Sequence, residues 1–162
     1  MAKKAAKTNA ARLLDREKIA YEPMHYSTDD GKVDGVSVAE KIGYPASTVY
    51  KTLVAVGSSK THYVFLVPVA EELDLKLAAK ASGEKKMEMV PVKEILALTG
   101  YVRGGCSPFG MKKPFATFLA REAASLEEII VSAGKIGAQI RLSPQDLLLV
   151  TKGQLAELTG QL

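Results

Sequence analysis

Apolar and polar residues alternate most clearly in two neighbouring segments near the middle of the chain. Residues 49–56 and 62–67 are rich in β-branched and aromatic residues, and Gly57-Ser58-Ser59-Lys60 separates them. This pattern predicts two strands joined as a hairpin. Because the strands of a hairpin pair antiparallel, the pattern argues against a purely parallel, doubly wound sheet.

The rest of the pattern predicts short helices and strands in irregular order. Helices are expected over residues 5–18, from a Ser37-x-x-Glu40 capping box to Gly43, over 75–81 after Asp74, from Pro91 to Gly100, and from Pro144 to about Val150. Strands are expected near residues 21–26, 86–90, 101–103, 115–119, 129–132 and 138–142. The tail from Thr151 is expected to be helical or frayed. These elements predict an α/β fold of the α+β kind, with a mixed, mostly antiparallel, curved sheet or partial β-barrel surrounded by helices.

Composition fits one globular domain spanning residues 1–162. The chain is 47% hydrophobic and 25% charged, and its net charge is +4. The single cysteine cannot form an internal disulfide. The basic N-terminus lacks the apolar stretch of a signal peptide, and no apolar run is long enough to cross a membrane. We therefore expect a cytoplasmic protein without membrane contact; its mild basicity suits either a polyanionic partner or an ordinary enzyme.

Lys51 stands in the first strand of the hairpin. Alternation places it on one face with Val49, Leu53 and Ala55. One interpretation is a lysine at a sheet edge whose ammonium reaches water. The other is a partly desolvated ammonium directed into a cleft, where it holds an anionic or carbonyl oxygen.

A glycine-rich loop, Gly104-Gly105-Cys106-Ser107-Pro108-Phe109-Gly110, is the second unusual feature. It contains three glycines and a proline in seven residues. Glycine allows backbone N–H groups to approach a ligand closely, so the loop is a candidate anion or oxyanion site; a structural Ω-loop is the alternative. It is neither a Walker loop nor a nucleophile elbow, because the required residue orders are missing.

Other candidate residues give weaker signals. Lys112, Lys113 and Lys135 are either a basic rim for phosphates or solvated surface lysines. The sequence shows no signature of a base that could activate Cys106 as a nucleophile. We therefore interpret Cys106 as a small apolar residue of the loop. His25 and His62 lack metal-ligand spacing, and no metal or other cofactor is expected.

Ordered motifs across residues 13–149 resemble the YbaK/EbsC family of aminoacyl-tRNA deacylases, which are similar to the editing domain of bacterial prolyl-tRNA synthetases. The matching segments are Val49-Tyr50-Lys51-Thr52-Leu53, Leu73-Asp74-Leu75-Lys76, Lys85-Lys86-Met87-Glu88-Met89, Thr99-Gly100-Tyr101, the glycine-rich loop with Lys112-Lys113, and Val131-Ser132-Ala133-Gly134-Lys135.

The resemblance implies a fold, a substrate and a set of site residues. The fold would be a mixed, barrel-like sheet with surrounding helices. The substrate would be cysteine mischarged on tRNA(Pro), removed in trans, in some cases beside prolyl-tRNA synthetase. The family's essential strand lysine matches Lys51, next to Thr52. Its pocket tyrosine matches Tyr26, its loop matches Gly104, Gly105, Cys106, Ser107 and Pro108, and its later turn matches Ser132 and Gly134.

The resemblance also implies a mechanism and its rivals. In the family's proposed chemistry the substrate's own thiol attacks its ester, so the protein supplies orientation and oxyanion stabilisation and needs no nucleophile.

Two positions depart from the family: Gln139 replaces a frequent aspartate, and Asp34 falls near an expected aromatic residue. Alternative functions are an Ala-tRNA(Pro) deacylase and a non-catalytic module that binds a tRNA end or a nucleotide. A cell-wall-associated regulator is disfavoured by the lack of an export signal.

Overall fold

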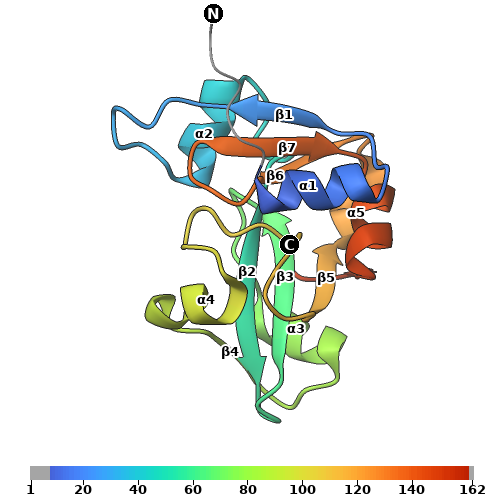
Figure 1. Cartoon of the computed structure of the whole chain (residues 1–162). Helices are drawn as coiled ribbons and strands as arrows, with labels where there is room; N and C mark the ends of the chain where they lie inside the picture. Colours follow the sequence, from blue (N-terminus) through green and yellow to red (C-terminus); the bar gives the residue numbers. More distant parts are fainter. Residues whose placement is uncertain (1–7, 161–162) are drawn as a thin grey trace, which may run out of the picture.

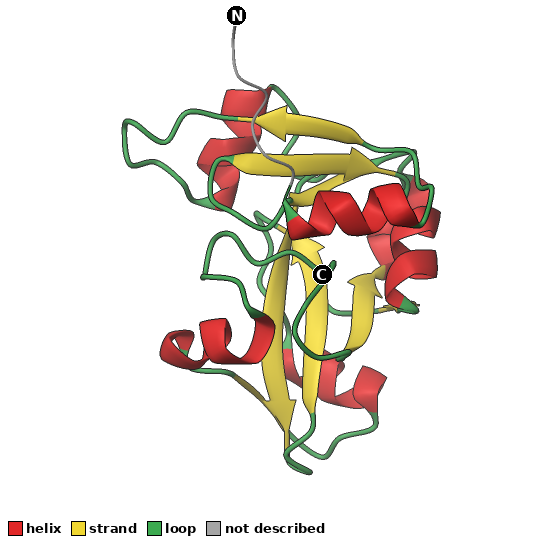
Figure 2. Cartoon of the chain, viewed as in Figure 1, coloured by secondary structure: helices red, strands yellow, loops and turns green. Residues whose placement is uncertain are grey.

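The structure is a computed structural model, and it describes residues 8–160. The helices of this part are α1 (Asn9–Arg16), α2 (Gly35–Ile42), α3 (Leu75–Ser82), α4 (Val92–Thr99), α5 (Pro144–Thr151) and the short 3-10 helix η1 (Arg121–Ser125). The strands are β1 (Glu22–His25), β2 (Tyr50–Gly57), β3 (His62–Pro68), β4 (Met87–Met89), β5 (Ala116–Ala120), β6 (Ile129–Ser132), β7 (Ala138–Leu142) and β8 (Gln154–Ala156). Figure 1 shows their arrangement and Figure 2 their types.

The strands form two sheets. The smaller sheet has the order β1-β7-β6 and is antiparallel, whereas the larger has the order β4-β2-β3-β5-β8. In the larger sheet β2 pairs antiparallel with β3 and β4, and β5 pairs parallel with β3 and β8. The expected mixed, mostly antiparallel α+β fold is confirmed. The sheets adjoin where Val49 forms a parallel bridge with Ile130, and they do not close into a barrel.

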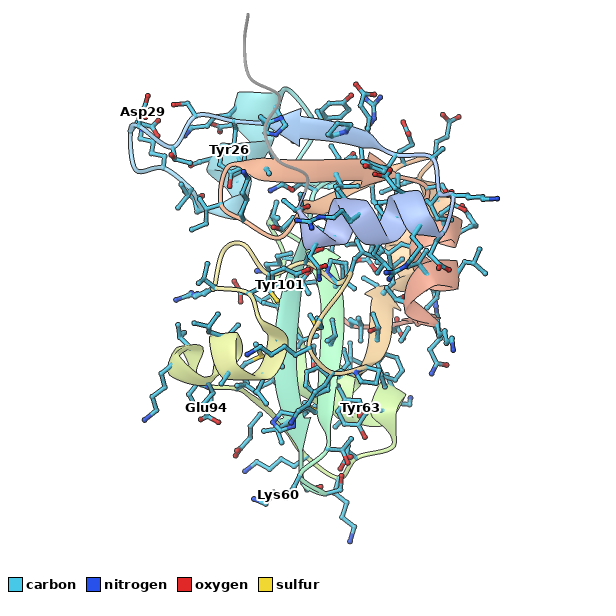
Figure 3. All side chains as sticks on the ribbon, in the orientation of Figure 1. Tyr26, Asp29, Lys60, Tyr63, Glu94 and Tyr101 are labelled. Carbon is cyan, nitrogen blue, oxygen red and sulfur yellow. The ribbon has the colours of Figure 1, made fainter. Side chains whose placement is uncertain are left out.

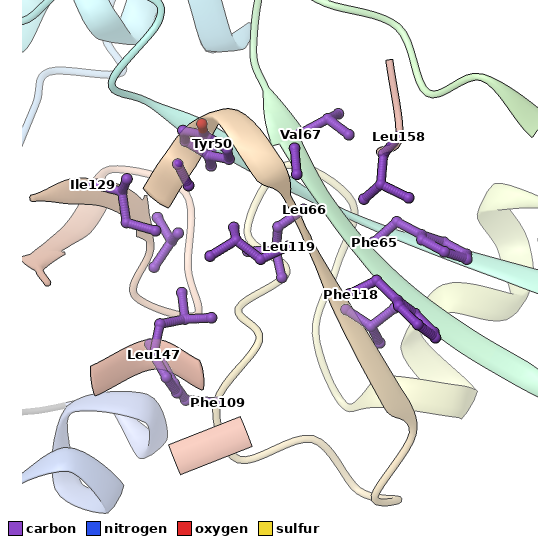
Figure 4. Packing of buried hydrophobic residues seen from close by; sticks show 14 of the residues in the cluster. Tyr50, Phe65, Leu66, Val67, Phe109, Phe118, Leu119, Ile129, Leu147 and Leu158 are labelled. Atoms are coloured by element: carbon purple, nitrogen blue, oxygen red, sulfur yellow. The ribbon is translucent and has the colours of Figure 1, made fainter. Parts of the chain in front are cut away.

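The hairpin follows the prediction from alternation. Strands β2 and β3 pair from Tyr50↔Pro68 to Val56↔His62, and Lys60 supplies the positive φ of +74° in the connecting turn. Phe65 of β3 stacks on Phe118 of β5, with ring centroids 5.5 Å apart. Figure 4 shows these rings within the main core, where burial of each large apolar side chain contributes about 1.5–3 kcal/mol. The core thus fixes the strand that carries Lys51.

The helix ends show which capping predictions hold. Asp74 caps α3 through hydrogen bonds from the N–H groups of Lys76 and Leu77, and Ser143 caps α5, both as expected. The predicted capping box at Ser37 is wrong. Asp34 is the N-cap of α2, and its carboxylate accepts from the Ser37 N–H at 3.1 Å. Asp34 therefore has a structural role at the position where the family resemblance led us to expect an aromatic side chain.

Two other predicted elements differ from the structure, and part of a third lies outside the described residues. Of the first helix, residues 5–7 lie outside the described part of the chain. Residues 101–103 are not a strand, because the Gly105 N–H donates to the Val102 carbonyl and turns the chain. In the described part of the tail the helix does not continue, because α5 ends at Thr151 with Lys152 (φ +57°) as its C-cap, and β8 then pairs with the open edge of β5. No helix of residues 8–160 has the length and apolar character needed to cross a membrane.

Candidate active site

A cleft of about 960 Å³ brings together several of the predicted site residues. It is lined by residues of β2, the loop before α2, the segment after β3, the start of the glycine-rich loop and the ends of β6 and β7. Its lining includes these predicted residues: Tyr26, Lys51, Thr52, Gly104, Cys106 and Ser132. The volume falls in the range of natural ligand sites. Segments far apart in sequence therefore share one concave surface.

Lys51 carries a cation into this cleft. Its side chain is 29% exposed, and its Nζ lies 3.9 Å from Oε1 of Glu72, a carboxylate that is 96% exposed. A long ion pair to a solvated carboxylate contributes little and dissociates easily. The interpretation of Lys51 as a partly desolvated ammonium in a cleft agrees with this geometry, and an anion can replace Glu72.

The start of the glycine-rich loop forms a second wall. Gly104 lines the cleft with φ at +87°, a conformation that favours glycine. A Cβ atom on Gly105 would lie 3.0 Å from the backbone of Lys135 and Ile136, so the absence of a side chain lets the loop pack against the later turn. The Gly105 N–H donates to the Val102 carbonyl, whereas the N–H groups of Gly104 and Cys106 have no backbone acceptor within residues 8–160. Those two amides remain available for an oxyanion.

The later turn, residues 132–137, faces the loop. Ser132 lines the cleft, and its hydroxyl oxygen accepts a hydrogen bond from the Gly134 N–H at 3.2 Å. Gly134 itself lies behind the cleft wall, with φ at +108°, and a Cβ there would lie 2.8 Å from the Tyr101 ring. Of these two predicted substrate-binding residues, Ser132 lines the cleft, whereas Gly134 determines the conformation of the turn.

Three residues that line the cleft carry a buried polar atom with no partner in the described part of the chain. These atoms are the Tyr50 hydroxyl oxygen, Oγ1 of Thr52 and Oε1 of Gln139. Gln139 is 7% exposed and pairs with Ser132 across β6 and β7. A buried acceptor without a donor costs about 1–3 kcal/mol. Such atoms fit a site in which a ligand supplies the missing hydrogen bond.

The structure leaves other predicted residues away from the cleft. Ser107 is fully buried, and its hydroxyl accepts from the Phe109 N–H inside the loop; Pro108 is also buried. Lys112 lies against Gly100 and Lys113 is exposed beyond the loop. Lys135 is exposed on the turn beside Gly105 and is not among the residues that line the cleft.

Cys106 is packed as part of the core. It is 7% exposed and lies in a small cluster with Val54, Val90 and Tyr101. Burial raises the pKa of its thiol to about 11, from an ordinary value of 9.0. At neutral pH the thiol is therefore protonated and a poor nucleophile, as its sequence context predicted.

Sequence reasoning missed three residues of the site region. Arg103 is exposed and lines the cleft, and Glu72 lies near Lys51. The Tyr101 hydroxyl donates a hydrogen bond to the Phe109 carbonyl of the glycine-rich loop; Figure 3 labels Tyr101 and Tyr26. Arg103 was not identified as a site residue from the sequence, because residues 101–103 were predicted to form a strand. Among the described residues no three His, Cys, Asp or Glu side chains gather as a metal site.

Comparisons with known proteins agree on one family. A family model described as "Aminoacyl-tRNA editing domain" matches residues 33–149. An Enterococcus faecalis protein named "Putative Cys-tRNA(Pro)/Cys-tRNA(Cys) deacylase EbsC" is 48% identical over 161 residues, which cover 98% of each chain.

Solved structures agree with the sequence comparisons. One described as "a putative trans-editing enzyme for prolyl tRNA synthetase" has a TM-score of 0.83 at 25% identity and covers 97% of this chain and 100% of its own. Another, from work on grafting epitopes onto scaffold proteins, has a TM-score of 0.84 at 25% identity and covers 95% and 96%.

Proposed function

We propose that this chain, which belongs to the aminoacyl-tRNA editing domain family, removes cysteine mischarged on tRNA(Pro) in trans. The coarser activity, deacylation of aminoacyl-tRNA, follows from the family and from the 48% identical relative. The name of that relative supports cysteine as the amino acid. The name of the structural relative supports action beside prolyl-tRNA synthetase, and tRNA charging then implies a cytoplasmic protein.

One observation carries this proposal: Lys51, Gly104, Ser132 and Tyr26 line a single cleft. The cleft offers a cation for a phosphate or ester oxygen and amide donors for a carbonyl oxygen. It also offers hydroxyl groups for the aminoacyl group or the ribose. The exposed side chains of Lys112, Lys113 and Lys135 are assigned to the acceptor stem of the tRNA.

The proposed reaction uses the thiol of the bound cysteine. Its sulfur attacks the ester carbonyl carbon, a carbon–sulfur bond forms, and the bond from that carbon to the ribose oxygen breaks. The thiol proton passes to the departing ribose oxygen, and the amino acid leaves as a cyclic thiolactone. Such an intramolecular attack depends mainly on orientation. The raised pKa of Cys106 supports this route because it disfavours a protein thiolate as the nucleophile.

In this mechanism the N–H groups of Gly104 and Cys106 hold the developing oxyanion. Lys51 supplies a fixed positive charge that positions the tRNA end. The cleft selects a small side chain, but one methylene group is worth only about 1–3 kcal/mol. We therefore assign selection of the tRNA to the partner synthetase.

A deacylation assay with purified protein tests the proposal. Cys-tRNA(Pro), Ser-tRNA(Pro) and Ala-tRNA(Pro) are compared at equal concentration. We expect cysteine to be released fastest and serine much more slowly, because a hydroxyl group of similar size is a weaker nucleophile than a thiol. Faster release of alanine would assign the protein to the alanine-editing branch. Binding without release of any amino acid would identify a non-catalytic module.

A further inference from the structure

The loop of residues 27–33 connects β1 to α2 and contributes to one wall of the cleft. Gly31 and Val33 line the cleft, as does Tyr26 immediately before the loop. The loop makes local hydrogen bonds: the Asp29 N–H donates to Ser27 Oγ, and the Gly31 N–H donates to the Thr28 carbonyl. These bonds shape the turn without attaching it to the body of the protein.

Lys41 of α2 makes that attachment. Its Nζ donates to the Ser27 carbonyl at 2.7 Å, to Oδ1 of Asp30 at 2.7 Å and to the Lys32 carbonyl at 2.8 Å. An ammonium group has three N–H donors, so all three are used on one loop. The Lys41 side chain is only 20% exposed. Every N–H donor of this partly buried ammonium group therefore has an acceptor, which is not the case for an ordinary surface ion pair.

The same cation also contacts the aromatic wall of the cleft. Nζ of Lys41 lies 5.9 Å from the centre of the Tyr26 ring, within the range of a cation–π interaction. The hydrogen bond from Lys41 lowers the pKa of the Asp30 carboxyl group, which keeps this acceptor ionised. Figure 3 shows Tyr26 and Asp29 on the part of the chain that Lys41 holds.

We propose that Lys41 is a positioning residue, which holds the 27–33 loop and Tyr26 in place as a preformed wall for the aminoacyl end of the substrate. The proposal rests on the proposed function, because it assigns the wall to substrate binding. Lys41 itself does not line the cleft and needs no contact with the substrate. Its loss should therefore weaken binding more than it slows the chemical step.

The test compares Lys41→Met with Lys41→Arg and Lys32→Met in the full chain. Methionine keeps the length of the side chain without donors, and arginine keeps the charge and several donors. Lys32→Met removes an exposed charge from the loop and leaves the three bonds of Lys41 intact, because Lys32 contributes only its carbonyl. Amide hydrogen exchange of residues 27–33 and steady-state deacylation of Cys-tRNA(Pro) are both measured.

For Lys41→Met we expect amide exchange in the loop to rise about tenfold and KM to rise about tenfold, with kcat changed less than about threefold. Lys41→Arg should recover much of both effects, and Lys32→Met should leave the amide exchange of the loop at the parental value. Unchanged loop exchange in Lys41→Met would overturn the proposal, as would a loosened loop with an unchanged KM. If the parent protein releases no amino acid, the proposed function fails, and the exchange data alone then decide whether Lys41 holds the loop.

Discussion

The hydroxyl group of Tyr101 donates a 2.5 Å hydrogen bond to the carbonyl oxygen of Phe109. This bond joins the two ends of the glycine-rich loop, whose first residues line the cleft. The Tyr101 ring also packs so closely on Gly134 that a Cβ there would clash with it. One buried side chain therefore contacts both the loop and the later turn.

Tyr101→Phe removes only the donor of this bond. We expect the free energy of unfolding to fall by about 1–3 kcal/mol, because the buried Phe109 carbonyl loses its partner. Deacylation should fall as well, since the loop loses its closure. Urea unfolding and the rate with Cys-tRNA(Pro) measure the two effects. Tyr63→Phe is the matched control: its hydroxyl donates to Glu84 at the end of the hairpin, outside the cleft. Equal deacylation by both variants would argue against a role of the loop in the reaction.

Lys51→Met tests the cation of the cleft while keeping most of the side chain. We expect kcat/KM to fall about 100-fold or more, because the cleft loses the fixed cation that positions the tRNA end. Lys86→Met makes the same change in net charge at a side chain that is 75% exposed and pairs with Glu88. That variant should lose at most a small, salt-dependent part of the rate. If a folded Lys51→Met protein works at the parental rate, Lys51 has no catalytic role.

The hairpin and the glycine-rich loop could be predicted because their signals are local. Alternation in residues 49–56 and the turn residues after Gly57 are sufficient to define two paired strands. Glycines around Cys106 likewise mark a loop of unusual conformation. The conformations of the hairpin and of the loop are determined mainly by residues close together in sequence, and both features are present in the structure.

The remaining site depends on contacts between distant segments, which no local pattern reveals. Asp34 competes successfully with Ser37 as the cap of α2, although the Ser-x-x-Glu spacing favours Ser37. Strand β8 forms because β5 leaves an open sheet edge, and residues 151–156 contain no signal of that edge. Gln139 reaches the cleft only because β7 lies between β1 and β6.

Cys106→Ser should keep deacylation within about threefold of the parent, because the thiol is buried, protonated and not the nucleophile. The raised pKa has a second consequence for stability. Between about pH 9 and 11 the folded protein keeps a proton on Cys106 that the unfolded chain has lost, so Cys106 makes stability decrease as pH rises. Cys106→Ser should flatten this decrease, as measured by thermal unfolding across that pH range. Complete loss of activity in a folded variant would instead support a protein nucleophile.

Gln139→Met should change stability and activity in opposite directions. Methionine has nearly the shape of glutamine without its buried Oε1, which has no donor in the described part of the chain. We expect the free energy of unfolding to rise by up to about 1 kcal/mol, since the cost of an unpaired acceptor disappears. We also expect kcat/KM for Cys-tRNA(Pro) to fall about tenfold, because a hydrogen bond to the bound substrate is lost. Gln145→Met, on the exposed side of α5, should change neither quantity. A Gln139→Met protein that is less stable and fully active would show that the side chain serves the fold and not the substrate.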